Sequence, residues 1–432
     1  MSRAFMVKIS FPSIMPRFLL AIASREKCNM SHYGMLLEGK CRRPVIGVRI
    51  APAVFVSVLF LCFGAPSFAS EFGDGLEQIE RDAKESQSIP EKSAVGKVLK
   101  KDSRFLPVPI PISNPTIGTG LAIAGIYLHS RKEGNPEGPV TTSGVAGLYT
   151  DSDSWAVAGF HDGFYRNDRV RFRALAGYGE FNVDFYGIGN DSPLRDNPVG
   201  LTSQGFVLKP RLLYRLPAGN WFLGFEYSYL GLNNVFDASS LLPGLPTIEN
   251  QTQTAGLGLV GVYDTRDNNI WPMKGTWFEG TATAYGEYAG GDFNYRKMIL
   301  KFAQYFSLLD PITFVYRLDG QFIDGFAPFY DLSRIRLRGY SGLEFLDKKA
   351  LTAQAEIRWN FYRRWTVLGF GGGGRVAKSI SDLGSTPTNY AAGGGIRYMI
   401  DERRKLNLGV DIAYAEGTEV SVYIQVGDWL AN

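Results

Sequence analysis

The segment Leu351-Thr352-Ala353-Gln354-Ala355-Glu356-Ile357-Arg358-Trp359-Asn360-Phe361 alternates apolar and polar side chains from end to end. Successive side chains of a β-strand point to opposite faces, so this pattern predicts a strand with one apolar and one polar face. The polar face keeps Glu356 and Arg358 in mid-strand, which suits a water-filled lumen. The unbroken apolar face is long enough for a tilted strand to cross membrane hydrocarbon. We therefore predict a membrane-spanning β-strand here.

The same alternation recurs from about residue 103 to the C-terminus, which predicts an all-β chain. A soluble sandwich alternates in the same way, but charged residues in mid-strand and long apolar faces favour a transmembrane antiparallel β-barrel. The clearest predicted strands lie near residues 117–129, 141–150, 154–164, 169–188, 203–216, 220–231, 253–263, 274–288, 292–308, 311–323, 349–361, 364–377, 389–400, 405–415 and 419–428. Bacterial barrels have an even number of strands, so a sixteenth strand is expected.

The segment Arg104 to Ile112 is the candidate for this sixteenth strand. It contains Pro107, Pro109 and Pro111, which a central strand excludes but a sheet edge tolerates, because proline has no N–H to donate. We expect it to pair with the last strand where the barrel closes. A seam that offers few backbone donors pairs weakly, so our hypothesis is that it opens sideways.

The links between strands predict the two ends of the barrel. Tight links at 165–168, 216–220, 362–364 and 401–405 are typical of periplasmic turns, and longer links at 190–202, 233–252, 325–347 and 379–388 are typical of surface loops.

Composition restricts the function classes. The 432 residues include 50 glycines, 22 tyrosines and 29 phenylalanines, a composition that suits a barrel. The net charge of +4 is small and the basic residues do not cluster, so we predict no nucleic-acid partner. The three cysteines, Cys28, Cys41 and Cys62, all precede residue 70, and the chain has only three histidines. We therefore predict no catalytic residues, no cofactor and no metal site, and do not expect an enzyme.

The N-terminal region carries an export pattern. Arg42, Arg43 and Arg49 flank and precede an apolar run from Ile50 to Gly64, which ends in a small-x-small site at Ala69. We predict a cleaved signal peptide over residues 35–69; the alternative is a buried core helix. Residues 1–34 are then expected to be an extension before the true start at Met35. Residues 70–102 are expected to be a short periplasmic segment, and residues 103–432 the barrel.

One connection looks specific. Within residues 325–347 it reads Arg334-Ile335-Arg336-Leu337-Arg338-Gly339-Tyr340, a basic loop with a glycine hinge between two alternating strands. Taken alone, this is also the pattern of an ordinary surface loop with solvated arginines.

Three stretches resemble one family. Ile335 to Tyr340, with Gly342 and then Ala355-Glu356-Ile357-Arg358, is similar to the signature of the bacterial surface antigen family, the barrel of BamA/TamA-type outer-membrane assembly and translocation proteins. The stretch Asp264 to Asn268, followed by Pro272 and Gly275, resembles the family's strand–turn–strand in mid-barrel. Residues 393–398 and 406–411 resemble two of its last strands. The resemblance covers about residues 103–432.

The resemblance implies an infolded loop. The family carries its Arg-Gly-aromatic motif, here Arg338, Gly339 and Tyr340 with Arg336 beside them, on a loop folded back into the lumen, with the arginine on an acidic wall residue. The strand phase independently places Glu356 on the lumen face, so we predict an Arg338–Glu356 pair. Asp264, Arg266, Asp267, Pro272 and Gly275 are predicted to form a structural turn rather than a calcium loop, because the ligand spacing and terminal Glu are missing.

The chain departs from the family in two ways. Relatives carry a second acidic partner in a Phe-x-Asp-x-Gly stretch on the following strand, where this chain has Gly372. The wall there leaves room, and Arg338 is expected to have one anchor fewer. The family's periplasmic polypeptide-binding repeats are also expected to be absent, which puts an autonomous insertase role in doubt.

The resemblance implies a role in insertion or export of proteins or lipids at the bacterial outer membrane. Its partners would be outer-membrane lipids or lipopolysaccharide, unfolded outer-membrane protein clients, or a separate periplasmic module. A passive channel is the alternative, with an anion preference from Arg169, Arg171, Arg173, Lys209, Arg211 and Arg215. A barrel lipid hydrolase is the remote alternative, because its only attractive base, His161, has Asp162 on the opposite strand face.

Overall fold

The computed structural model describes residues 105–129, 141–217, 219–237, 239, 247–268, 271–402, 405–418 and 420–431. The strands are β1 (Phe105–Asn114), β2 (Gly118–Leu128), β3 (Thr142–Thr150), β4 (Trp155–Tyr165), β5 (Val170–Phe185), β6 (Val199–Arg215), β7 (Trp221–Asp237), β8 (Ile248–Asp264), β9 (Gly275–Tyr285), β10 (Tyr295–Leu309), β11 (Ile312–Gly325), β12 (Ser333–Arg334), β13 (Leu346–Asp347), β14 (Lys349–Tyr362), β15 (Trp365–Ala377), β16 (Asn389–Asp401), β17 (Leu406–Ala415) and β18 (Ser421–Val426). Short 3-10 turns occur at η3 (Glu287–Ala289), η4 (Phe329–Asp331), η5 (Asp382–Gly384) and η6 (Trp429–Ala431).

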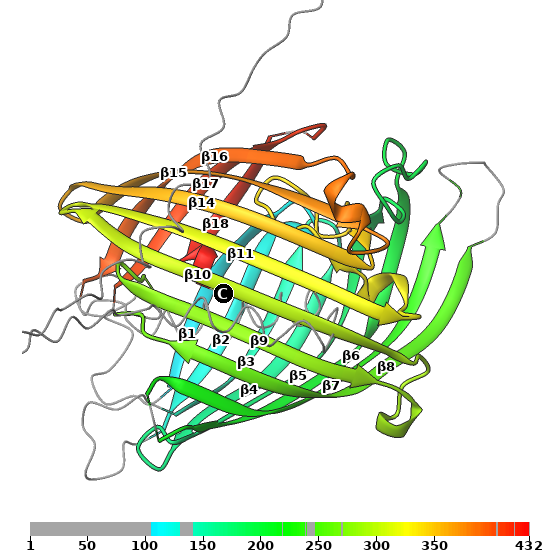
Figure 1. The fold of residues 1–432 in the computed structure, drawn as a ribbon, viewed down its shortest axis with the longest axis horizontal. Coiled ribbons are helices and arrows are strands. Elements are labelled where there is room, and N and C mark those ends of the chain that lie inside the picture. The colour runs from blue at the N-terminus through cyan, green and yellow to red at the C-terminus, as the bar shows by residue number, and fades with distance from the viewer. Residues whose placement is uncertain are drawn as a thin grey trace, which may run out of the picture. The chain divides into compact units, whose positions relative to one another are not determined.

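The strands form an antiparallel 16-stranded sheet in which each strand pairs with its neighbours in sequence, while β12 and β13 form a separate two-stranded sheet. The sheet curls until β1 and β18 lie side by side (Figure 1). The predicted all-β, 16-stranded antiparallel barrel is confirmed, including the proline-rich strand as its first member. The predicted N-terminal segments 1–34, 35–69 and 70–102 lie outside the described residues.

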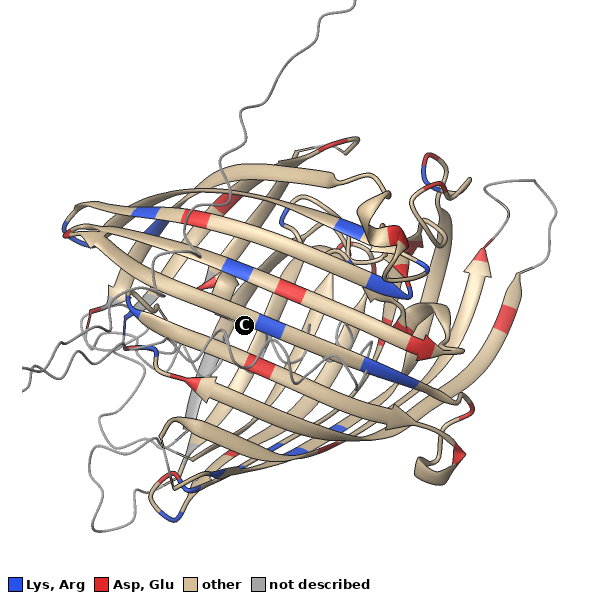
Figure 2. Ribbon diagram, in the orientation of Figure 1, with Lys and Arg blue, Asp and Glu red and all other residues tan. Residues whose placement is uncertain are grey.

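The two faces of the strands meet different surroundings. In β14, Ile357 and Trp359 are 49% and 52% exposed, whereas Glu356 and Arg358 between and beside them are 1% and 2% exposed. Figure 2 shows such charged residues in the middle of β10, β11 and β14. An exposed apolar face opposite a buried charged face is the arrangement of a transmembrane barrel, with lipid outside and a polar lumen inside. Within the described ranges, no helix has the length and hydropathy of a membrane span.

The lumen has a second, apolar wall that the sequence analysis did not predict. Strands β2 to β4 bury Ala124, Leu148 and Phe160 on the inner face while exposing Ile123 and Val145 on the outer face. Both faces of these strands are apolar, so the alternation that marks a wet lumen is weak there. The inner residues join a core with Leu332, Leu343 and Leu346 from the loop between β11 and β14.

Several strands extend further than predicted. β6 begins at Val199, β7 continues to Asp237 and β8 begins at Ile248, so the expected loops 190–202 and 233–252 are shorter. The added ends carry polar residues such as Asn233 and Thr202 and remain paired with their neighbours. Hydrogen bonding continues beyond the apolar belt, where the alternation of hydrophobicity that predicts strands has already ended.

Candidate functional site

The connection between β11 and β14 packs into the barrel. Within it, Arg334, Arg338 and Tyr340 are 2%, 1% and 5% exposed. The near end is anchored on β10, where Lys297 Nζ donates to Asp331 Oδ1 at 2.9 Å and to the Asp331 carbonyl at 2.7 Å. We call residues 326–348 the plug loop.

Arg338 lies at the middle of a chain of buried charges that we call the ion network. The network runs, with alternating sign, through Asp428, Arg358, Glu356, Arg338, Asp411 and Arg397. Arg338 Nη2 lies 2.5 Å from Glu356 Oε2, and Arg338 Nη1 lies 2.9 Å from Asp411 Oδ2. Three guanidinium and three carboxylate groups balance in formal charge, which makes this burial tolerable.

The expectation that Arg338 lacks a second acidic anchor is wrong, because Asp411 on β17 supplies it. The inner face of β15 contributes an aromatic contact instead of a carboxylate: the guanidinium carbon of Arg338 lies 3.5 Å from the centroid of the Phe370 ring. Gly372 leaves room for the plug loop, as expected, since a Cβ there would lie 2.9 Å from Leu337 Cδ2.

Gly339 needs to be glycine for two reasons. Its φ is +115°, and a Cβ would lie 2.8 Å from the Cβ of Ala415 on β17. The N–H of Gly339 donates to the hydroxyl of Tyr423 on β18 at 2.7 Å. The next residue, Tyr340, donates its hydroxyl to the Tyr390 carbonyl at 2.9 Å. The motif thus attaches the plug loop to β16, β17 and β18.

The predicted turn between β8 and β9 reaches the same network from the other end of the barrel. Asp264 holds Arg266 through two hydrogen bonds of 2.9 and 2.8 Å, and Asp267 Oδ1 accepts the N–H of Met273 at 2.9 Å. Gly275 has φ +112° at the base of the turn.

The tip of this turn caps the ion network. The Pro272 carbonyl accepts from Arg358 Nη1 at 3.1 Å, and the guanidinium carbon of Arg358 lies 3.9 Å from the Trp271 ring centroid.

The residues after β18 also fold inward. Asp428 Oδ1 accepts from Arg358 Nη2 at 2.5 Å, and the Leu430 carbonyl accepts from Arg317 Nη1 at 3.1 Å. Sequence reasoning missed Asp411 and Asp428 as network members. Asp411 did carry a signal, because it falls on the polar face of its strand. Asp428 follows the last strand, so no alternation of apolar and polar residues could indicate where its side chain points.

The seam between β1 and β18 is unusual. No backbone ladder joins these edge strands in the described part of the chain. A side-chain hydrogen bond does link them, because Ser113 Oγ donates to the Val422 carbonyl at 2.8 Å. The N–H groups of alternate residues in a strand point the same way, so Pro107, Pro109 and Pro111 remove donors from a single edge. β1 is paired with β2 along its whole length, so the edge of β1 that keeps its N–H groups must be the one that bonds to β2. The edge lacking donors therefore faces β18.

The plug loop contacts both sides of this seam. Gly339 binds Tyr423 on β18, while the N–H of Gly342 donates to Thr116 Oγ1, in the turn after β1, at 3.0 Å. The loop therefore bridges the two edge strands from inside the lumen, where the strands themselves share little direct bonding.

The charges proposed to line an anion pathway are largely held by carboxylates. Arg171 binds Asp168 at 2.7 Å, Arg173 binds Asp162 at 3.3 Å, and Arg211 binds Glu226 at 2.6 Å. A lumen of paired charges, filled in part by the plug loop, does not favour the passive channel.

The hydrolase alternative also gains nothing. Asp162 faces inward to Arg173, whereas His161 is on the other strand face, with its Nδ1 2.8 Å from Ser143 Oγ. The two therefore do not form a histidine–carboxylate unit. Among the described ranges, no group of three His, Cys, Asp or Glu side chains is placed to hold a metal ion.

Glu344 predicts a pH dependence of plug-loop docking. Burial raises the pKa of Glu344 to about 7, although the Ser341 N–H and the nearby Arg195 act in the opposite direction. In the undocked loop the pKa is about 4.3, so docking gains a proton between about pH 4 and pH 7. The docked loop is thus most stable below this window, and loses at most about 4 kcal/mol as pH rises through it.

Hydrogen exchange of residues 332–347 checks this expectation. Protection should be lower at alkaline than at mildly acidic pH, and Glu344→Gln, which keeps an oxygen for the Ser341 N–H, should remove the difference. Equal protection of the unaltered loop at both pH values would contradict it.

Comparison with known proteins agrees with this fold. Residues 222–335 match the Omp85 superfamily domain. BamA from Haemophilus ducreyi lacking POTRA domains 1–3 has a TM-score of 0.51 at 14% identity, over 76% of this chain and 71% of that chain. CdiB from Escherichia coli has a TM-score of 0.53 at 10% identity, over 76% of this chain and 63% of that chain. The chain thus spans less than two thirds of the CdiB chain, and at these identities the likeness is one of fold. No curated protein sequence matches the chain.

Proposed function

We propose that this 16-stranded barrel, whose residues 222–335 match the Omp85 superfamily domain, is a BamA/TamA-type barrel that aids insertion or export of proteins or lipids at the bacterial outer membrane by opening between β1 and β18. The observation that carries this proposal is the seam: one edge is depleted of donors by prolines, and no backbone ladder closes it among the described residues. An exposed strand edge can also template pairing of an incoming strand.

The plug loop acts as the latch in this proposal. It holds β18 through Gly339 and the β1–β2 turn through Gly342, and Arg338 fixes it to the wall. Partners follow from this role: outer-membrane lipids or lipopolysaccharide, unfolded outer-membrane protein clients, and a separate periplasmic module that delivers them. Delivery to the outer membrane through a cleaved signal peptide over residues 35–69 belongs to the same proposal.

A disulfide across the seam tests the proposal. The Ser113–Val422 contact identifies facing residues, so Ser113→Cys with Val422→Cys should cross-link β1 to β18 under oxidation. In cells whose only copy is this variant, we expect the oxidised barrel to reproduce the envelope defect of a deletion strain, and reductant to restore function.

The single-cysteine variants are the matched controls and should behave as wild type. A cross-linked barrel that still supports normal surface protein and lipopolysaccharide would reject lateral opening. Single-channel recording separates the alternative: a steady, large conductance that survives cross-linking would favour the passive channel.

A further inference from the structure

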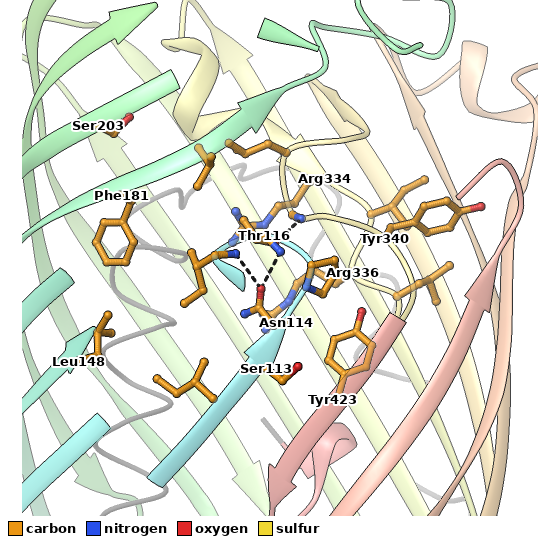
Figure 3. A pocket seen from close by; sticks show the side chains of 18 of the residues that line it. Ser113, Asn114, Thr116, Leu148, Phe181, Ser203, Arg334, Arg336, Tyr340 and Tyr423 are labelled. Atoms are coloured by element: carbon orange, nitrogen blue, oxygen red, sulfur yellow. Dashed lines mark hydrogen bonds between the residues drawn. The ribbon is translucent and has the colours of Figure 1, made fainter. Parts of the chain in front are cut away.

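A cavity of about 170 Å³ lies between the plug loop and the seam. Its lining includes Pro111 to Asn114 of β1 and Tyr423 to Gln425 of β18. Figure 3 shows Ser113, Asn114 and Tyr423 around it, on the two edge strands. Neighbours in a strand face opposite sides, so consecutive residues can line one cavity only where it reaches the strand edge. The cavity therefore extends from the lumen into the unladdered gap between β1 and β18.

The inner side of the cavity is apolar. Leu148, Phe181, Leu201 and Leu232, from β3 and β5 to β7, contribute to the wall that surrounds it. Apolar side chains of this kind gain free energy when they cover a hydrocarbon group, so this side of the cavity suits an acyl chain.

The loop side of the cavity is cationic. Arg334 and Arg336 line it, and no Asp or Glu does so among the described residues. Arg336 is half-buried, and Asn114 and Thr116 lie beside it in Figure 3. Guanidinium and amide groups next to an apolar wall complement a phosphate joined to a hydrocarbon chain.

We propose that this cavity binds an anionic membrane lipid, with one acyl chain against the apolar wall and its phosphate at Arg336. The lipid enters from the bilayer through the gap between β1 and β18. This inference rests on the proposed function, because it uses the same opening between β1 and β18. It adds that an anionic lipid is the molecule that passes through this opening.

The test places a reporter where only an entering lipid can reach it. In the full chain with Cys28, Cys41 and Cys62 replaced by serine, Leu148→Cys carries a fluorophore in the cavity. The matched control is Val145→Cys, on the same strand but 60% exposed on the outer face. Vesicles of phosphatidylcholine contain either phosphatidic acid or diacylglycerol, each with brominated acyl chains that quench on contact. These two lipids differ only in the phosphate.

Brominated phosphatidic acid should quench the cavity reporter with about tenfold higher affinity than brominated diacylglycerol, the effect of about 1.4 kcal/mol from a charged hydrogen bond. Arg336→Gln should remove this preference, while the outer-face reporter is quenched by both lipids. Adding N–H donors to the β1 edge with Pro109→Thr and Pro111→Thr should abolish cavity quenching.

Equal quenching by both lipids, or none, would overturn the lipid site, and quenching that persists after the proline changes would overturn the route. If the Ser113–Val422 cross-link abolishes function but phosphatidic acid does not reach the cavity, the lipid site fails while lateral opening stands. If the cross-link leaves function intact, lateral opening itself fails.

Discussion

Replacing Arg338 by alanine is expected to lower the free energy of unfolding by about 3–5 kcal/mol, the usual cost of breaking a buried ion pair from one side. The change leaves Glu356 and Asp411 buried, each without the guanidinium that now binds it. Arg358 and Arg397 still contact one of these carboxylates each, so the network is left with excess negative charge. The plug loop should then leave the lumen.

Two measurements check this result: the temperature at which the folded barrel unfolds on gels, and protease cleavage within residues 326–348. Arg338→Lys keeps the charge but loses the planar fork that reaches two carboxylates, so an intermediate loss is expected. Arg336→Ala is the matched control, because Arg336 is outside the ion network, and it should leave the loop protected. An unchanged unfolding temperature and an uncut loop in Arg338→Ala would disprove the latch.

Restoring donors to the seam is expected to have the opposite effect on stability and to abolish function. With Ser113 opposite Val422, residue 111 faces Ile424 in an antiparallel pair. Pro109→Thr together with Pro111→Thr supplies two N–H groups towards β18, each worth about 0.5–1.5 kcal/mol if a hydrogen bond forms. Threonine also suits a strand. The barrel should unfold at a higher temperature and lose its cellular function.

Pro115→Thr, in the turn just after β1, is the matched control and should change neither property. Slower hydrogen exchange at residues 109 to 113 than in neighbouring edge positions would show the new ladder. A variant that gains this protection and still functions normally would show that the activity does not require the seam to open.

Much of the fold was predictable from local alternation. The strand Lys349–Tyr362 has a single repeat of apolar and polar residues, and its phase alone placed Glu356 in the lumen. Even the first strand was predictable, because three prolines at alternate positions suit only an edge. These features are local: the pleat of one strand decides them.

The plug loop was partly predictable. Its arginines and glycine resembled a known signature, and the strand phase offered Glu356 as a partner for Arg338. The bare inner position of β15 at Gly372 was visible as space, and the structure fills it with Leu337; Ile335 takes the space at Gly374, which was not foreseen. Which residues replace the missing acidic partner was not visible.

The sequence by itself determined the strands, their inner and outer faces, and the glycine that the loop turn needs, since each depends on a few adjacent residues. Only the tertiary structure decided that Asp411, Asp428 and the β8–β9 turn meet Arg338 and Arg358, and that one loop touches both β1–β2 and β18. Those contacts join segments far apart in the chain. They exist only after the sheet has curled far enough to bring its first and last strands together.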